Sequence, residues 1–139
     1  MNHIDKKNIR VVVADDNEPL RKKLIHLLES YFDVVGAAAD GKTALELIML
    51  TNPDVAVLDI SMPFMTGIEV TAELSKNLSD TKIVIFTIHR DPDFVRAALD
   101  AGATGYVLKS DLVKDLTTAV LNVYEGKVFV SPNCALYQS

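Results

Sequence analysis

The sequence predicts an α/β protein with a doubly wound parallel sheet, and two patterns point to this class. Five short apolar segments recur along the chain, and several are continuous runs of Val, Ile and Leu. Continuous runs are typical of strands that are covered on both faces. Segments with helical periodicity separate these runs, and regular alternation of strand and helix favours a parallel sheet with right-handed crossovers.

The five expected strands lie at residues 9–14, 34–39, 55–60, 83–88 and 104–108. Apolar side chains spaced three or four residues apart indicate helices between and after them, most clearly over residues 20–31 and 112–123. Residues that favour helix starts precede the helical segments: Asn17 or Glu18 with Pro19, Asp40, Asp91 with Pro92, and Ser110 or Asp111. Five strands joined in this way predict the order 2-1-3-4-5, the flavodoxin-like arrangement.

The length of 139 residues fits one domain, which we place at residues 9–125, between a flexible N-terminus at 1–8 and a linker or tail at 126–139. The formal net charge of −5 argues against direct binding of nucleic acid or anionic lipid by this segment. Cys134 is the single cysteine, which excludes an internal disulfide and fits a reducing compartment. Because no signal peptide or membrane-length apolar run is present, we expect a cytoplasmic protein without a membrane partner.

Charged and hydroxyl side chains follow the predicted strands. Asp15 and Asp16 come after the first strand, Asp59 lies near the end of the third, Thr87 near the end of the fourth, and Lys109 follows the fifth. Ligands of open parallel sheets bind beyond the carboxyl ends of the strands. Four of the strands are neighbours in the predicted order, so we expect these five side chains to converge on one edge of the sheet.

This combination suits phosphoryl transfer. Three carboxylates repel one another unless a cation compensates them, and Mg²⁺ prefers carboxylate and water oxygens. A carboxylate can act as the nucleophile, and solitary Asp59 is the best candidate, whereas the pair Asp15 and Asp16 suits a metal. Taken singly, Asp16 is typical of a helix cap, Lys109 of a solvated lysine at a strand end, and Thr87 of an ordinary strand residue. Only their joint placement favours a functional site.

At these residues the sequence resembles the response-regulator receiver family of two-component systems, over about residues 10–127. The resemblance rests on Val-Ala-Asp-Asp at 13–16, Leu-Asp-Ile-Ser-Met-Pro at 58–63 with Gly67, Phe-Thr-Ile-His at 86–89, and Gly-Ala-Thr-Gly-Tyr-Val-Leu-Lys at 102–109. Each piece is weak alone, but their order and intervals are specific.

The resemblance implies a phosphoprotein rather than a classical enzyme, with only Mg²⁺-dependent self-phosphotransfer and self-dephosphorylation. It implies that Asp59 accepts the phosphoryl group from the phosphohistidine of a sensor histidine kinase. Asp15, Asp16, Asp59 and the backbone carbonyl of Ser61 then hold Mg²⁺. Lys109 pairs with the phosphoryl group.

The resemblance also implies a switch, in which Thr87 rotates inward to the phosphoryl group and Tyr106 follows it. Ile88 is bulkier than the small residue common there, so we expect it to slow self-dephosphorylation. His89, near the site mouth, either tunes the chemistry or is an ordinary loop residue. Ser110 replaces the proline that usually follows the lysine, which leaves the geometry of that loop open.

Finer details resemble the NarL/FixJ class, whose members carry a C-terminal LuxR-type helix-turn-helix domain. Either such a domain, and DNA binding through it, lies beyond this chain, or the protein is a stand-alone receiver acting through protein contacts. Residues 131–139 resemble the linker of this family, which favours the presence of such a domain beyond this chain. A homodimer formed on phosphorylation is a further implied partner, through helices one and five or through the face of helix four and strand five.

Two other functions compete with the switch. A metal-dependent phosphatase with an aspartyl-phosphate intermediate usually needs a second carboxylate two residues after the nucleophile, where this chain has Ser61. A degenerate receiver would serve only as an interaction module, but all the expected site residues are present. We therefore favour the phosphorylation switch over the phosphatase and over the interaction module.

Overall fold

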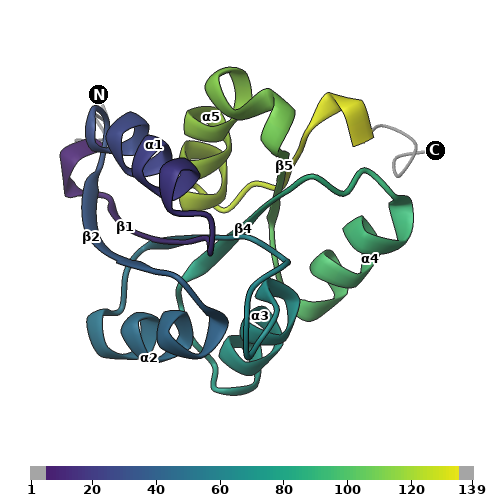
Figure 1. Ribbon diagram of the computed structural model, residues 1–139, viewed down its shortest axis with the longest axis horizontal. Coiled ribbons are helices and arrows are strands. Elements are labelled where there is room, and N and C mark those ends of the chain that lie inside the picture. The colour runs from purple at the N-terminus through teal and green to yellow at the C-terminus, as the bar shows by residue number, and fades with distance from the viewer. Residues whose placement is uncertain (1–5, 135–139) are drawn as a thin grey trace.

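A computed structural model describes residues 6–134 as a parallel sheet with helices on both faces (Figure 1). The strands are β1 (Arg10–Ala14), β2 (Asp33–Ala38), β3 (Val55–Leu58), β4 (Lys82–Thr87), β5 (Gly105–Leu108) and β6 (Phe129–Val130). The helices are α1 (Glu18–Glu29), α2 (Gly41–Thr51), α3 (Gly67–Lys76), α4 (Pro92–Ala101) and α5 (Leu112–Tyr124), with short 3-10 turns η1 (Lys6–Asn8) and η2 (Lys109–Asp111).

The sheet has six strands in the order β2-β1-β3-β4-β5-β6, and every neighbouring pair is parallel. The predicted class and the order of the first five strands are confirmed. The prediction of five strands is wrong, because β6 adds to the free edge of β5 from within the segment expected to be a linker. Its ladder includes hydrogen bonds from the N–H of Phe129 to the carbonyl of Thr104 at 2.9 Å and from Ser131 to Tyr106 at 2.8 Å.

Two apolar layers bury the two faces of the sheet. Helices α1 and α5 cover one face, and α2, α3 and α4 cover the other (Figure 1). The first layer includes the buried side chains Leu24, Leu28, Leu116 and Val120, and the second includes Ile48, Leu74 and Val95. Burial of each such side chain stabilises the fold by about 1.5–3 kcal/mol. Cover on both faces explains why the strand segments are continuously apolar.

The predicted helix starts are largely as expected. Asn17, Asp40 and Asp91 are N-caps whose side chains accept hydrogen bonds from backbone N–H groups in the first turns of α1, α2 and α4. Asp111 precedes α5 but makes no side-chain capping bond, because the 3-10 turn η2 runs directly into the helix. These caps fix where the chain leaves each strand end, and so they help to place the residues that follow β1 and β4.

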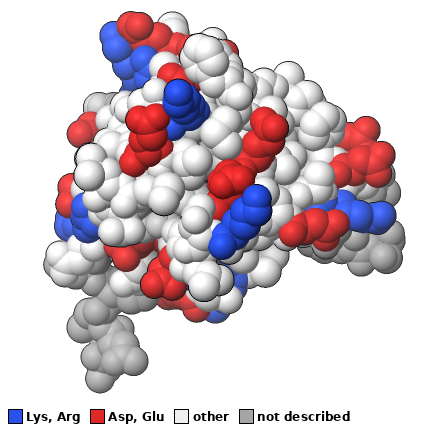
Figure 2. Space-filling view, turned by 90° about the horizontal axis from the view of Figure 1, so that it is seen from below, with Lys and Arg blue, Asp and Glu red and all other residues white. Residues whose placement is uncertain are grey.

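The lower face of the molecule carries charges of both signs. Figure 2 views this face from below, with lysines and arginines interspersed among acidic residues on a largely uncharged surface. An intermixed face of this kind does not create an extended field of one sign. Among residues 6–134, no helix has the length and apolar character that crossing a membrane requires.

Candidate functional site

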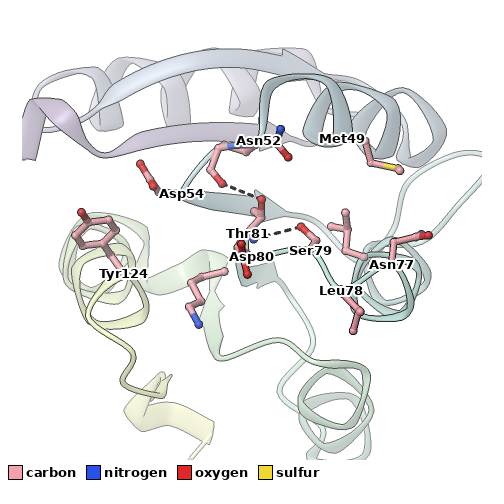
Figure 3. A pocket seen from close by; sticks show the side chains of 12 residues that line it. Met49, Asn52, Asp54, Asn77, Leu78, Ser79, Asp80, Thr81 and Tyr124 are labelled. Carbon is pink, nitrogen blue, oxygen red and sulfur yellow. Dashed lines mark hydrogen bonds between the residues drawn. The ribbon is translucent and has the colours of Figure 1, made fainter.

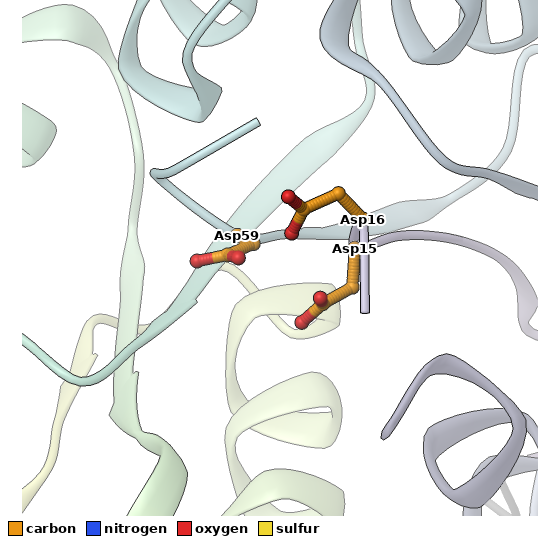
Figure 4. Close-up of side chains that lie close together, drawn as sticks. All are labelled: Asp15, Asp16 and Asp59. Carbon is orange, nitrogen blue, oxygen red and sulfur yellow. The ribbon is translucent and has the colours of Figure 1, made fainter. Parts of the chain in front are cut away.

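The carboxyl edge of the sheet gathers the acidic side chains that the sequence singled out. Asp15 and Asp16 follow β1 and Asp59 follows β3, and Figure 4 shows the three carboxylates lying close together where these strands end. One carboxylate oxygen from each of the three residues lies within 4.8 Å of the others. Asp15 and Asp59 are buried, whereas Asp16 is exposed, so the cluster opens to solvent on one side.

Backbone pairing beyond the strand ends fixes these acids. The N–H of Asp59 donates to the carbonyl of Ala14 at 3.0 Å, and the N–H of Asp15 donates to the carbonyl of Ala38 at 3.1 Å. The start of α3 packs directly on Asp59. A Cβ atom at Gly67 would lie 2.2 Å from the Asp59 carbonyl oxygen, so only glycine permits this approach.

Lys109 supplies the positive charge of the cluster. Its Nζ atom lies 3.0 Å from Asp15 Oδ2 and 3.1 Å from Asp59 Oδ2, and its side chain is only 18% exposed. Burial alone lowers the pKa of Lys109, but its hydrogen bond to Asp15 and the charges of both carboxylates outweigh this and raise the pKa overall. The lysine therefore stays protonated between the two acids.

The surroundings of Asp59 disfavour its negative charge. Burial raises the pKa of its carboxyl group above the usual value, the negative charge of Asp15 adds to the rise, and Lys109 opposes it. A carboxylate in this setting is more basic than one in water and gains from any additional positive charge nearby. The N–H of Ser61 donates to Asp59 Oδ1 at 3.3 Å and orients the group.

The donor set fits a hard divalent cation. Three carboxylates face one ammonium group, which leaves a surplus of negative charge. Asp15 Oδ2 is buried and, apart from the ion pair with Lys109, has no hydrogen-bond partner among the described residues. Oxygen ligands with a solvent-accessible side are what Mg²⁺ accepts, because this ion retains part of its water shell.

The end of β4 leads to a second group of predicted residues. Thr87 is buried, and its Oγ1 accepts a hydrogen bond from the N–H of His89 at 3.2 Å. The hydroxyl of buried Tyr106 donates to the carbonyl of His89 at 2.6 Å. The His89 ring stacks on Phe94 at 4.2 Å between centroids. Ile88 is 71% exposed. The Thr87 hydroxyl oxygen thus accepts from the loop after β4 rather than bonding to an acid of the cluster.

Two buried polar residues near Lys109 were not predicted from the sequence. Ser131 Oγ accepts from the N–H of Leu108 at 3.1 Å and donates to Asp115 Oδ2 at 3.3 Å. Helical spacing carried a signal for Asp115, since it lies three residues after Leu112 and so faces the core side of α5. Nothing in the local sequence marks Ser131, whose role depends on β6.

A groove lies at the opposite, amino edge of the sheet (Figure 3). Asn52, Thr81 and Tyr124 are among its lining residues. The hydroxyl of Thr81 donates to the carbonyl of Pro53 at 2.8 Å. Because these residues precede β3 and β4 or end α5, the groove is separate from the acids that follow the strands.

A doubly wound domain with an acidic cluster and a partly buried lysine at the carboxyl edge of its sheet matches the arrangement expected of a receiver domain. The chain belongs to the response regulator receiver domain family, whose model matches residues 11–121. The family assignment predicted from the motifs is therefore confirmed.

Individual relatives refine this assignment. The chain is 36% identical over 131 residues to the transcriptional regulatory protein DegU of Brevibacillus brevis, covering 93% of this chain and 56% of that protein. It is 36% identical over 135 residues to the probable transcriptional regulatory protein NarL of Mycobacterium tuberculosis, covering 96% and 62%. The chain therefore spans only about three fifths of the length of these relatives.

Solved structures show the same fold. A LuxR-family two-component response regulator from Aurantimonas superposes with a TM-score of 0.87 at 34% identity, covering 92% of this chain and 93% of that one. The isolated receiver domain of RcsB from Salmonella enterica serovar Typhimurium, solved in the presence of the phosphomimetic BeF₃⁻, gives a TM-score of 0.84 at 25% identity, covering 94% and 98%. The chain thus shares its fold with a LuxR-family response regulator and with an isolated receiver domain.

Proposed function

We propose that Asp59 accepts a phosphoryl group from a sensor histidine kinase and that this modification switches the domain between two conformations. One observation carries the proposal: buried Asp59 has a raised pKa and lies 3.1 Å from the Lys109 ammonium group beside two further carboxylates. The isolated receiver domain of RcsB has been solved in the presence of the phosphomimetic BeF₃⁻, which supports phosphorylation as the signal in a relative.

The chemistry follows from these side chains. A carboxylate oxygen of Asp59 forms the new P–O bond while the P–N bond of the phosphohistidine breaks, and the leaving imidazole takes up a proton. Lys109 stabilises the charge on the phosphoryl oxygens as a fixed positive group. Mg²⁺ bound by Asp15, Asp16, Asp59 and the backbone carbonyl of Ser61 would supply further positive charge. Slow hydrolysis of the aspartyl phosphate resets the domain.

The switch begins at Thr87. A phosphoryl group on Asp59 brings about −1.5 to −2 charges and new acceptor oxygens. The Thr87 hydroxyl turns to donate to one of them, which changes its bond with His89 and, through His89, the position of Tyr106. A modification shifts a conformational equilibrium only through such differential contacts. The expected result is a reshaped surface of α4, β5 and α5.

The longer relatives support a role in the control of transcription. DegU and NarL are transcriptional regulatory proteins that extend well beyond the matched segment. RcsB has been solved as two dimers bound to two parallel DNAs. We expect a cytoplasmic protein that controls transcription through a C-terminal LuxR-type domain and forms homodimers on phosphorylation. A stand-alone receiver acting through protein contacts is the alternative.

Labelling tests the proposal directly. The protein is incubated with acetyl phosphate in Mg²⁺ or in EDTA, and intact mass spectrometry detects the added phosphoryl group. We expect labelling only with Mg²⁺ and none in Asp59→Asn. Asp54→Asn is a matched control, because Asp54 flanks the other end of β3. Labelling of Asp59→Asn, or no labelling of the wild-type protein, contradicts the proposal, and steady turnover of phosphomonoesters indicates a phosphatase instead.

A further inference from the structure

The ladder between β5 and the chain after β6 ends in a side-chain bond. The N–H of Ser131 donates to the carbonyl of Tyr106 at 2.8 Å, which continues the parallel pairing. In a regular parallel ladder the carbonyl of Ser131 would next accept from the N–H of Leu108. That carbonyl instead accepts from Cys134 at 2.8 Å, and the Ser131 hydroxyl oxygen takes its place, accepting from Leu108 at 3.1 Å.

The Ser131 hydroxyl is itself held by a buried carboxylate. It donates to Asp115 Oδ2 at 3.3 Å, Ser131 is fully buried, and Asp115 is only 5% exposed. Asp115 lies in the first turn of α5, where the helix dipole stabilises negative charge. A backbone N–H, a hydroxyl and a carboxylate therefore form one charge-assisted chain away from water.

This chain of bonds ends next to the site. Leu108 directly precedes Lys109, whose ammonium group lies between Asp15 and Asp59. We infer that Ser131, oriented by Asp115, is a positioning residue that holds the backbone from which Lys109 reaches the phosphoryl group. The inference rests on the proposed function of Asp59.

The backbone around Lys109 needs such an anchor. Ser110 follows Lys109, so no proline ring fixes the next φ angle, and the chain turns at once into η2. Without the Ser131 hydroxyl, the Leu108 N–H loses its acceptor and Asp115 loses its donor, both in a buried setting. Relaxation of the end of β5 then moves Lys109 relative to Asp59, while the acids that follow β1 and β3 keep their own backbone bonds.

The test compares rates of Mg²⁺-dependent phosphorylation by acetyl phosphate in the wild-type protein, Ser131→Ala, Asp115→Asn, the double variant and Thr81→Val. Thr81→Val is the control, because it removes a hydroxyl hydrogen bond to a backbone carbonyl at the opposite edge of the sheet. We expect Ser131→Ala to lower the maximal rate by roughly tenfold, since a misplacement of about 1 Å can slow a reaction up to 10²-fold. The half-saturating Mg²⁺ concentration should change less than the maximal rate, because the acids that would hold the ion keep their own backbone bonds.

Non-additivity separates positioning from general destabilisation. Asp115→Asn is expected to slow the reaction less than Ser131→Ala, and the double variant to lose no more than Ser131→Ala alone. Equal maximal rates for wild-type protein and Ser131→Ala, or an equal loss in Thr81→Val, overturn the inference. If Ser131→Ala does not fold, an unchanged rate in Asp115→Asn overturns it. An unlabelled wild-type protein overturns the proposed function, whereas labelled wild-type protein with equally fast variants overturns only the role of Ser131.

Discussion

The hydroxyl of Tyr106 donates a hydrogen bond to the backbone carbonyl of His89 at 2.6 Å, so a buried aromatic of β5 is tied to the loop after β4. The N–H of the same His89 donates to Thr87 Oγ1 at 3.2 Å. Burial raises the pKa of Tyr106 above its usual range, and the phenol therefore remains a donor at physiological pH. A single residue thus connects the hydroxyl of Thr87 to the aromatic ring proposed to follow it.

Tyr106→Phe should lower the free energy of unfolding by about 1 kcal/mol, because the buried donor is lost. In the phosphorylated protein it should also reduce the chemical-shift changes of α4 and β5. Denaturant unfolding and NMR spectra measure the two effects. Tyr124→Phe is the control, since Tyr124 is 39% exposed at the end of α5. Tyr106→Phe spectra that respond as fully as those of the wild-type protein would count against the proposed coupling.

Asp59→Asn should melt at a higher temperature than the wild-type protein at neutral pH in EDTA. Burial, reinforced by the charge of Asp15, raises the pKa of Asp59. The folded state then binds a proton more readily than the unfolded chain, so stability declines as pH rises from the ordinary aspartate pKa through the raised value. Asparagine is uncharged and avoids this loss.

The advantage of Asp59→Asn should vanish when the pH falls below the ordinary aspartate pKa, where both states of the wild-type protein are protonated at this position. Thermal unfolding across the acid-to-neutral range gives the comparison, with Asp54→Asn alongside. A lower melting temperature for Asp59→Asn at neutral pH would show that the ion pair with Lys109 outweighs the effect of burial.

Lys109→Met should reduce the free energy of unfolding by about 2–3 kcal/mol, because it leaves two buried carboxylates without their counter-charge. The loss is below the range for fully buried pairs, since the Lys109 side chain is 18% exposed. Mg²⁺ should restore more stability to this variant than it adds to the wild-type protein. Denaturant unfolding with and without Mg²⁺ tests this, with exposed Lys82→Met as the control. Equal Mg²⁺ effects would mean that the cation does not share the acids with Lys109.

Ile88→Ala should lose the phosphoryl group faster than the wild-type protein. Ile88 follows Thr87 at the end of β4 and is 71% exposed, and a bulky side chain next to Thr87 would hinder the approach of water to a phosphoryl group on Asp59. Decay of the labelled proteins after removal of acetyl phosphate gives the rates. Val113→Ala is a matched control, because Val113 is a similarly exposed apolar residue on α5. Identical decay of the Ile88→Ala and wild-type proteins would end this explanation.

Local patterns in the sequence predicted most of the fold. The strands β1, β3, β4 and β5 are buried on both faces, which makes their segments continuously apolar and visible in the sequence. The gathering of Asp15, Asp59 and Lys109 followed from a general property of parallel sheets, whose strand ends share an edge. Predicting this cluster required no knowledge of side-chain contacts.

Features that depend on packing between distant segments were not accessible in this way. β6 is two residues long and has no periodicity of its own, so only its pairing with β5 defines it. The bonds of Ser131 to Leu108 and Asp115 exist only once that pairing has formed. The orientation of the Thr87 hydroxyl toward His89 likewise depends on a loop conformation that no local pattern specifies.

The short β6 has a practical consequence for work with this domain. An uncovered strand edge offers free N–H and C=O groups to another chain, and natural proteins protect such edges against aggregation. A version trimmed directly after α5 would remove the partners of Thr104, Tyr106 and Leu108 along β5. Such a shortened protein should form oligomers by strand addition, and a version that retains Ser131 should stay monodisperse.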